Sequence, residues 1–141
     1  MTLWVVDADV GFKWHVEQPD SDQAERVLAL GGELHAPDFQ YLEVRQVLAK
    51  YVRMNLISSA SAMHAQASHR SMIAFWHDHK QLADHAFDLA LKHSHAFYDC
   101  LYLALALRLN GRLVTADKAF ARKFADGEHA GRIVLLQDFA G

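Results

Sequence analysis

The sequence predicts an α/β fold in which helices flank a mainly parallel central sheet. Short apolar stretches of strand length alternate with longer helical patterns, and the turns between them are brief, as is typical of parallel α/β sheets. In addition, the segment from Cys100 to Leu107 contains eight apolar residues in succession, and strong helix formers dominate it. Because a helix that is apolar on all sides is buried, we expect Phe97 to Leu109 to form the central core helix.

Length and composition are those of one globular domain. The chain has 141 residues, of which 52% are hydrophobic, so we expect a single domain that spans residues 1–141. A net charge of −3 argues against a general nucleic-acid coat, which would be basic, but allows an enzyme that contacts nucleic acid through a local patch. The single cysteine, Cys100, fits a reducing, cytoplasmic compartment. The N-terminal residues MTLWVVDADV do not resemble a signal peptide, and no stretch is long enough to cross a membrane.

Two strands are expected in the first half of the chain. Leu3 to Val6 is short, apolar and partly β-branched, which predicts a buried parallel strand with Asp7 at its C-terminal end. Leu34 to Ala36 could form a second strand. Three helices are expected here, over Val10 to Val16, from about Gln23 to Leu30, and from Pro37-Asp38 to about Asn55. The second has a possible cap at Ser21 or Asp22 and an end signal at Gly31-Gly32.

The second half of the chain is expected to be mostly helical. Ser58 to His79 predicts one long helix, and Asn110-Gly111 is a signal for the end of the central helix. The remaining elements expected here are helices over Gln81 to Lys92 and Lys118 to Ala125, the second with a possible cap at Asp117, and strands over Arg112 to Thr115 and Ile133 to Leu136.

Four acidic residues occupy positions at which sites often form. Asp7 and Asp117 each follow an apolar strand-like run, and the C-terminal edge of a parallel sheet is where binding sites lie. Asp99 opens the core helix, and Glu43 lies on a helical stripe with apolar neighbours. Folding could bring these four acids together, although their spacing alone leaves this open.

Four carboxylates in one crevice would repel one another and raise each other's pKa values unless a cation neutralised them. Oxygen ligands select hard ions such as Mg²⁺ or Mn²⁺, which orient water and stabilise the oxyanions of phosphodiester hydrolysis. Each acid also has a simpler explanation: a helix cap for Asp117, a favourable dipole position for Asp99, an ion pair with Arg45 or Lys50 for Glu43, and a strand end for Asp7.

Four segments, VVDADVGFKW, PDFQYLEVRQVLAK, FYDCLYLALAL and LVTADKAF, resemble the PIN-domain ribonucleases in order and spacing, most closely the VapC-type toxins of bacterial toxin–antitoxin pairs. The resemblance implies a three-layer fold with a parallel sheet, a Mg²⁺ or Mn²⁺ site of clustered acids, and cleavage of single-stranded RNA. It also implies an antitoxin protein as partner and a homodimer. The family's catalytic and metal-binding acids fall on Asp7, Glu43, Asp99 and Asp117, and Thr115 matches the family's hydroxyl residue.

The chain departs from the family pattern at two positions. The family usually has Ser, Thr or Asn two residues after the first acid, and here this residue is Asp9. Asp9 could be an additional ligand or a supporting acid, or it could point to solvent, which is the interpretation we favour. The family also favours a small residue two positions after the Glu, and here Arg45 could contact phosphate or pair with Glu43.

Basic residues and histidines have weaker signals. Arg45 and Lys118 are candidates for holding RNA phosphates, because cations position the backbone without reading sequence, but both could also lie on ordinary solvated helix faces. The chain has ten histidines without a zinc motif, and we interpret them as solvated. His95, one turn before Asp99, could still approach the acidic site.

Two other functions stay open from the sequence. A strand that ends in Asp-x-Asp, as in LWVVDADV, also resembles the haloacid-dehalogenase phosphatases, in which Asp7 would be the nucleophile. The third possibility is a domain that binds a partner without catalysis.

Overall fold

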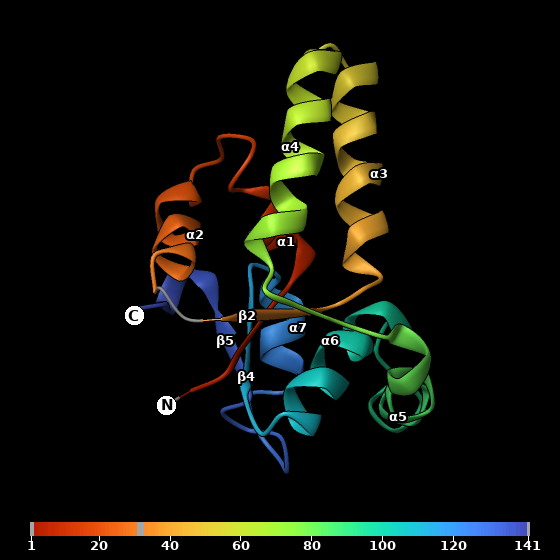
Figure 1. Cartoon of the computed structure of the whole chain (residues 1–141). Coiled ribbons are helices and arrows are strands. Elements are labelled where there is room, and N and C mark those ends of the chain that lie inside the picture. The colour runs from red at the N-terminus through yellow and green to blue at the C-terminus, as the bar shows by residue number, and fades with distance from the viewer. Residues whose placement is uncertain (1, 31–32, 141) are drawn as a thin grey trace.

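The computed structural model describes residues 2–30 and 33–140, which form a five-stranded, fully parallel sheet with helices on both faces (Figure 1). The strand order is β3-β2-β1-β4-β5. The predicted α/β class with a mainly parallel sheet and flanking helices is therefore confirmed. The strands are β1 (Trp4–Val6), β2 (Leu34–Pro37), β3 (Phe75–His77), β4 (Arg112–Thr115) and β5 (Ile133–Leu135).

The helices occupy most of the chain between the strands. They are α1 (Ala8–Phe12), α2 (Ser21–Leu28), α3 (Gln40–Arg53), α4 (Ser59–Met72), α5 (His79–His93), α6 (Phe97–Arg108) and α7 (Lys118–Lys123), with a short 3-10 helix, η1 (Leu136–Asp138), after β5. Helices α3 and α4 form an antiparallel pair that extends beyond the sheet (Figure 1).

The central strands are buried on both faces, which explains why they are apolar without alternation. Val5 of β1 and Leu113 of β4 pack against α5, α6 and α7, whereas Val6 and Val114 pack on the other face, against α1, α2 and η1. Helix α6 is the centre of the first cluster, and its residues 100–106 are at most 2% exposed. The prediction of a central core helix is confirmed.

The predicted long helix over Ser58 to His79 is wrong beyond Met72, over its last third. Helix α4 ends at Met72, and the chain then forms the edge strand β3, in which Phe75 pairs with His35 of β2. A three-residue strand offers no periodic pattern, so its sequence does not distinguish it from a helix. The side chains of His35 and His77 meet across the two strands at 2.9 Å, a contact that only the tertiary fold creates.

Smaller differences concern the ends of helices. Helix α1 begins at Ala8, two residues earlier than expected, because Asp7 caps it. Asn110 takes a positive φ of 52° after α6, as the predicted end signal requires. A Cβ at Gly111 would lie 2.4 Å from the carbonyl oxygen of Leu3, so glycine is needed where β4 meets β1. The predicted helix end at Gly31-Gly32 lies outside the described residues.

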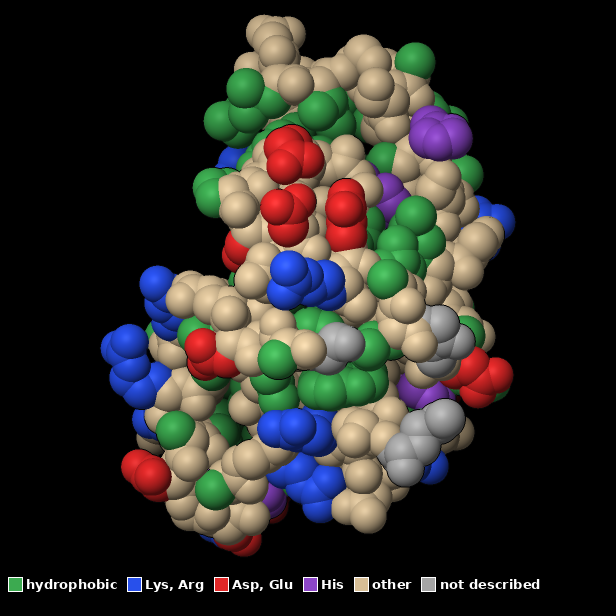
Figure 2. Space-filling model, turned by 90° about the vertical axis from the view of Figure 1, so that its left-hand side faces the viewer, with side chains coloured by type: hydrophobic (Ala, Val, Ile, Leu, Met, Phe, Trp, Pro, Cys, Tyr) green, Lys and Arg blue, Asp and Glu red, His purple; other side chains and the backbone are tan. Residues whose placement is uncertain are grey.

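The surface carries charges of both signs. On the side that bears α2 and the two chain ends, acidic and basic side chains both occur (Figure 2), in keeping with the small net charge. Within residues 2–30 and 33–140, no helix has the length and apolar character needed to cross a membrane.

Candidate active site

The four predicted acids line one cleft at the C-terminal edge of the sheet. Asp7 follows β1 and Asp117 follows β4, and these strands are neighbours. Glu43 comes from the first turn of α3, and Asp99 comes from the first turn of α6. A fifth acid, Asp9 of α1, lines the same cleft, which has a volume of about 690 Å³. The fold thus gathers five carboxylates that are far apart in the sequence.

Asp7 is the most buried of these acids, with 7% exposure. One carboxylate oxygen accepts the N–H of Ala8 at 2.7 Å, and the hydroxyl of Thr115 donates to the other oxygen at 2.8 Å. Thr115 Oγ1 also accepts the N–H of Asp117 at 3.1 Å. The buried hydroxyl of Thr115 therefore links the two acids at the strand ends.

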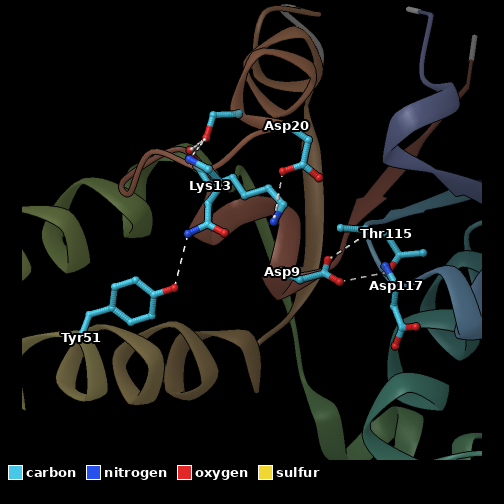
Figure 3. Close-up of polar contacts among 9 residues, drawn as sticks. Asp9, Lys13, Asp20, Tyr51, Thr115 and Asp117 are labelled. Carbon is cyan, nitrogen blue, oxygen red and sulfur yellow. Dashed lines mark hydrogen bonds and ion pairs between the residues drawn. The ribbon is translucent and has the colours of Figure 1, made fainter. Parts of the chain in front are cut away.

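Asp9 points toward the end of β4 (Figure 3). Its Oδ1 accepts the N–H of Ala116 at 3.2 Å, and its Oδ2 lies 3.4 Å from Thr115 Oγ1. The expectation that Asp9 faces solvent is therefore wrong. Because α1 begins directly after Asp7, its first turn directs Asp9 into the cleft.

Glu43 is held by a chain of buried polar side chains. The hydroxyl of Tyr102 donates to Glu43 Oε1 at 2.5 Å. Gln40, which is fully buried, donates through Nε2 to the carbonyl oxygen of Val6 at 2.6 Å, and the same nitrogen lies 3.4 Å from the Tyr102 hydroxyl. Gln40 Oε1 lies 2.7 Å from His69 Nε2. The chain of contacts thus joins the core of the sheet to a carboxylate of the cleft.

The protonation of His69 follows from these partners. Burial lowers the pKa of His69 to about 3, so the ring is neutral. Since an amide oxygen can only accept, Nε2 of His69 carries the proton and donates to Gln40, and Nδ1 accepts from His15 Nε2 at 3.0 Å. A Cβ at Gly11 would lie 2.7 Å from the His69 ring, so glycine makes room for it. The expectation of solvated histidines is wrong for His69 and also for His35, which are 2% and 8% exposed.

Asp99 and Asp117 also line the cleft, and each has a hydrogen-bond partner. His95 Nε2 lies 2.8 Å from Asp99 Oδ2, and the His95 ring stacks on Phe120 with centroids 4.8 Å apart. His95 thus makes the approach to the acidic site that the sequence left open. Asp117 Oδ1 accepts the N–H of Phe120 at 3.1 Å, so this acid caps α7 while lining the cleft.

Burial and mutual repulsion raise the pKa values of four acids of the cleft, Asp7, Asp9, Glu43 and Asp99. Burial is the main cause for Asp7, whose pKa lies well above its usual range, and the charge of Asp9 is the second cause. Burial also raises the pKa of Asp9 to about 6 and the pKa values of Glu43 and Asp99 above their usual range. Carboxyl groups that resist ionisation in this way would be stabilised in the charged form by a divalent cation.

The donor set fits a hard divalent cation that keeps part of its water shell. Carboxylates are the ligands such ions prefer, and Mg²⁺ commonly takes only one or two of them directly. Within the described parts of the chain, the groups of three ligand atoms that all lie within 4.8 Å of one another occur elsewhere, at His93, Glu128 and His129 and at Asp38, Asp78 and His79. The acids of the cleft would therefore hold an ion partly through water.

Positive charge at the cleft comes from two lysines, Lys13, which directly follows α1, and Lys50 of α3. Lys13 Nζ lies 3.4 Å from Asp20 Oδ1 (Figure 3), and its charge opposes the rise in the pKa of Asp9. The sequence did not single out Lys13, because the helix expected over Val10 to Val16 places this residue in mid-helix rather than at a helix end. Once α1 is known to start at Ala8, the position of Lys13 at the end of this helix follows.

Arg45 and Lys118, the two predicted phosphate contacts, are not among the described residues that line the cleft. Arg45 donates to the carbonyl oxygen of Tyr41 at 2.8 Å and bonds to Gln66 of α4, so it neither pairs with Glu43 nor faces the acids. Lys118 is exposed at the start of α7.

Fold and site together define an α/β protein with a carboxylate-lined cleft at the C-terminal edge of a parallel sheet. The family model of the PIN domain matches residues 4–124, a range that includes all five acids, and the chain belongs to the PIN-domain family. This confirms the family resemblance seen in the sequence. It also argues against the haloacid-dehalogenase alternative, in which Asp7 would be the nucleophile.

Relatives of known name or structure agree with this assignment. The chain is 36% identical over 122 residues to Ribonuclease VapC3 of Pyrobaculum aerophilum. The matched region covers 85% of this chain and 93% of the relative. It is similar in fold to a Pyrobaculum aerophilum protein of known crystal structure, with a TM-score of 0.73 and 18% sequence identity. The superposition covers 96% of this chain and 90% of that protein. A chain from a toxin–antitoxin complex of Klebsiella pneumoniae has a similar fold, with a TM-score of 0.69 and 15% sequence identity. This superposition covers 96% of this chain and 98% of the Klebsiella chain.

Replacing Asp9 by Asn should stabilise the metal-free protein at neutral pH. Burial holds the pKa of Asp9 at about 6 in the folded state, above its ordinary value, so the folded protein resists losing this proton. Wild type should therefore lose stability relative to Asp9→Asn as the pH rises from about 4 to about 7, because the folded state binds more protons there than the unfolded state. Thermal unfolding of both proteins in EDTA across this range measures the difference.

Asp22→Asn removes the same charge from an exposed position on α2 and controls for net charge. Excess Mg²⁺ should shrink the advantage of Asp9→Asn, since the cation would stabilise the ionised carboxylate. If Asp9→Asn were more stable than wild type by the same amount at every pH, the raised pKa of Asp9 in the folded protein would be contradicted.

Replacing Gln40 by Leu should destabilise the protein by about 2–4 kcal/mol, because Val6, His69 and Tyr102 would lose a buried hydrogen-bond partner. Chemical denaturation measures the change in the free energy of unfolding. Gln46→Leu, at an exposed position of the same helix, should change it by less than about 0.5 kcal/mol. Equal effects of the two substitutions would show that the buried chain adds no stability.

Proposed function

We propose that this protein is a divalent-metal-dependent endoribonuclease that hydrolyses phosphodiester bonds of RNA and acts as the toxin of a type II toxin–antitoxin pair. The observation that carries the proposal is the convergence of five carboxylates in one cleft of a PIN-domain chain. The name of the relative Ribonuclease VapC3 supports ribonuclease activity. The fold shared with a chain from a toxin–antitoxin complex supports the toxin role.

In this proposal Asp7, Glu43, Asp99 and Asp117 hold Mg²⁺ or Mn²⁺, directly or through water, and Asp9 adds negative charge beside them. When bound, the ion supplies an activated water and offsets the charge that develops on the phosphate oxygens.

Neighbouring side chains keep the carboxylates in position. Thr115 donates to Asp7, and Tyr102 donates to Glu43. These hydrogen bonds fix the orientation of the ligands before an ion arrives, as partners behind a metal-binding side chain generally do.

RNA would meet both charge and aromatic surface at the cleft. Lys13 and Lys50 can neutralise phosphates on either side of the scissile bond. Tyr98 also lines the cleft, is 56% exposed and stacks on Phe39 with ring centroids 4.5 Å apart, so its free face can receive a base of a single strand. Arg45 would contact RNA only outside this cleft.

The groove between α3 and α4 supports an antitoxin partner. Its floor is apolar and Arg45 and Arg53 lie along it, which suits an amphipathic helix with acidic flanks. The exposed side chains of Phe87 and Leu91 on α5 support a homodimer. We also propose a cytoplasmic location and a single domain over residues 1–141.

Asp99→Asn and Asp7→Asn should each lower RNA cleavage by on the order of 100-fold or more, because each removes a carboxylate that holds the ion. The assay uses purified protein free of any copurified partner and a pool of cellular RNA, with Mn²⁺, Mg²⁺ and EDTA lanes. Circular dichroism checks that each variant is folded.

Asp88→Asn is the matched control, since Asp88 is an exposed acid on α5. It should cleave as wild type does. Full activity in either cleft variant, or cleavage that persists in EDTA, would refute the proposed site. No cleavage by folded, partner-free wild type would instead favour a domain that only binds a partner.

A further inference from the structure

A second group of potential metal ligands lies apart from the carboxylate cleft. His93 ends α5, and Glu128 and His129 belong to the segment that follows α7. We call these three residues the His93–Glu128–His129 cluster. The two histidines of this cluster are expected from the sequence to be solvated, but folding brings the ring centroids of His93 and His129 to 5.6 Å from each other.

The distances within this cluster fit one shared ion better than they fit hydrogen bonds. Glu128 Oε1 lies 3.6 Å from His129 Nε2 and 4.0 Å from His93 Nε2, both longer than a hydrogen bond. All three ligand atoms lie within 4.8 Å of one another. Ligands about 2.0–2.1 Å from a tetrahedral zinc ion are separated by about 3.3 Å, so small side-chain adjustments would close this site.

His93 provides a second, independent observation. Its Nε2 is buried and has no hydrogen-bond partner within the described residues, which is a costly state for a ring nitrogen. The ring packs on Phe124 with centroids 4.8 Å apart, and this contact directs the ring toward Glu128 and His129. A metal ion would supply the partner that Nε2 lacks.

We propose that His93, Glu128 and His129 form a binding site for Zn²⁺, with water as the fourth ligand. Two imidazoles and one carboxylate select a borderline transition-metal ion, whereas the carboxylates of the cleft select a hard ion. The two sites therefore differ in metal preference. The proposal does not depend on the nuclease function.

Lys92 sets the position of Glu128 before zinc binds. Its ammonium group contacts Glu128 Oε1 at 2.5 Å. A carboxylate has two oxygens, and the Glu128 side chain is 53% exposed, so it can turn and keep Lys92 on one oxygen while the other binds zinc.

Zinc at this site would tie the segment after α7 to the corner between α5 and α6. Phe124 also packs against His95, with centroids 5.7 Å apart, and His95 contacts Asp99 at 2.8 Å. The cluster therefore shares a packed aromatic contact with one wall of the carboxylate cleft. Zinc should act here as a structural clamp.

The experiment measures zinc binding and thermal unfolding of the full chain. The metal-free protein receives Zn²⁺ in the presence of excess Mg²⁺, which competes with Zn²⁺ for the carboxylate cleft. We expect one equivalent to bind by calorimetry and to raise Tm by roughly 5–10 °C at zinc about a hundredfold above Kd. Co²⁺ in place of Zn²⁺ should give the visible absorption of a tetrahedral site.

His129→Gln and Glu128→Gln should each weaken zinc binding at least about tenfold and remove most of the Tm shift. His64→Gln, at an exposed position on α4, is the matched control and should bind as wild type does. Glu128 is exposed and His129 lies outside helices and strands, so these variants should fold even if His93→Gln does not. Unchanged zinc affinity in both variants, no Tm shift, or loss of binding in Asp7→Asn but not in His129→Gln would overturn the proposal.

Discussion

Repulsion among carboxylates that are partly removed from water is the constraint on which the rest of the site depends. Five acids share one cleft, and burial raises the pKa values of four of them, Asp7, Asp9, Glu43 and Asp99. A buried carboxylate without partners is costly, so the fold surrounds these acids with donors from the backbone and from neutral side chains. A divalent cation bound in the cleft would complete this balance, because it would favour the ionised form of every acid at once.

The donors are held by the same core that builds the fold. Tyr102 projects from the buried face of α6 and is 1% exposed, so its hydroxyl reaches Glu43 from a fixed position. Behind it, Gln40 and His69 continue the hydrogen-bonded chain away from the cleft. The central helix thus has two roles, since it fills the apolar core and also places Asp99 in the cleft and the Tyr102 hydroxyl against Glu43. Packing and site geometry therefore cannot be changed separately at these positions.

Much of this arrangement could be predicted from the sequence, because the strongest signals are local. An apolar run followed by Asp7, and another followed by Asp117, mark strand ends that a parallel sheet must bring together. What could not be predicted depends on tertiary contacts. Strand β3 is too short to show a period, and the direction of Asp9 depends on where α1 begins. Arg45 turns toward Gln66 only because α4 packs beside α3. The burial of His69 could not be predicted for the same reason, because the neutral ring is stabilised by its hydrogen bond to Gln40, a contact that only the folded chain creates.

Proton release on metal binding is the measurement that tests the central claim most directly. If crowded carboxyl groups with raised pKa values are the ligands or neighbours of the ion, Mg²⁺ must displace protons from them, and more at about pH 6, near the pKa of Asp9, than at about pH 8. Calorimetry of Mg²⁺ binding in two buffers of different ionisation enthalpy gives the number of protons released. Binding with clear proton release at the lower pH, lost in Asp7→Asn, is the expected result. Absence of binding, or binding without proton release at either pH, would contradict the claim that these acids form a cation site.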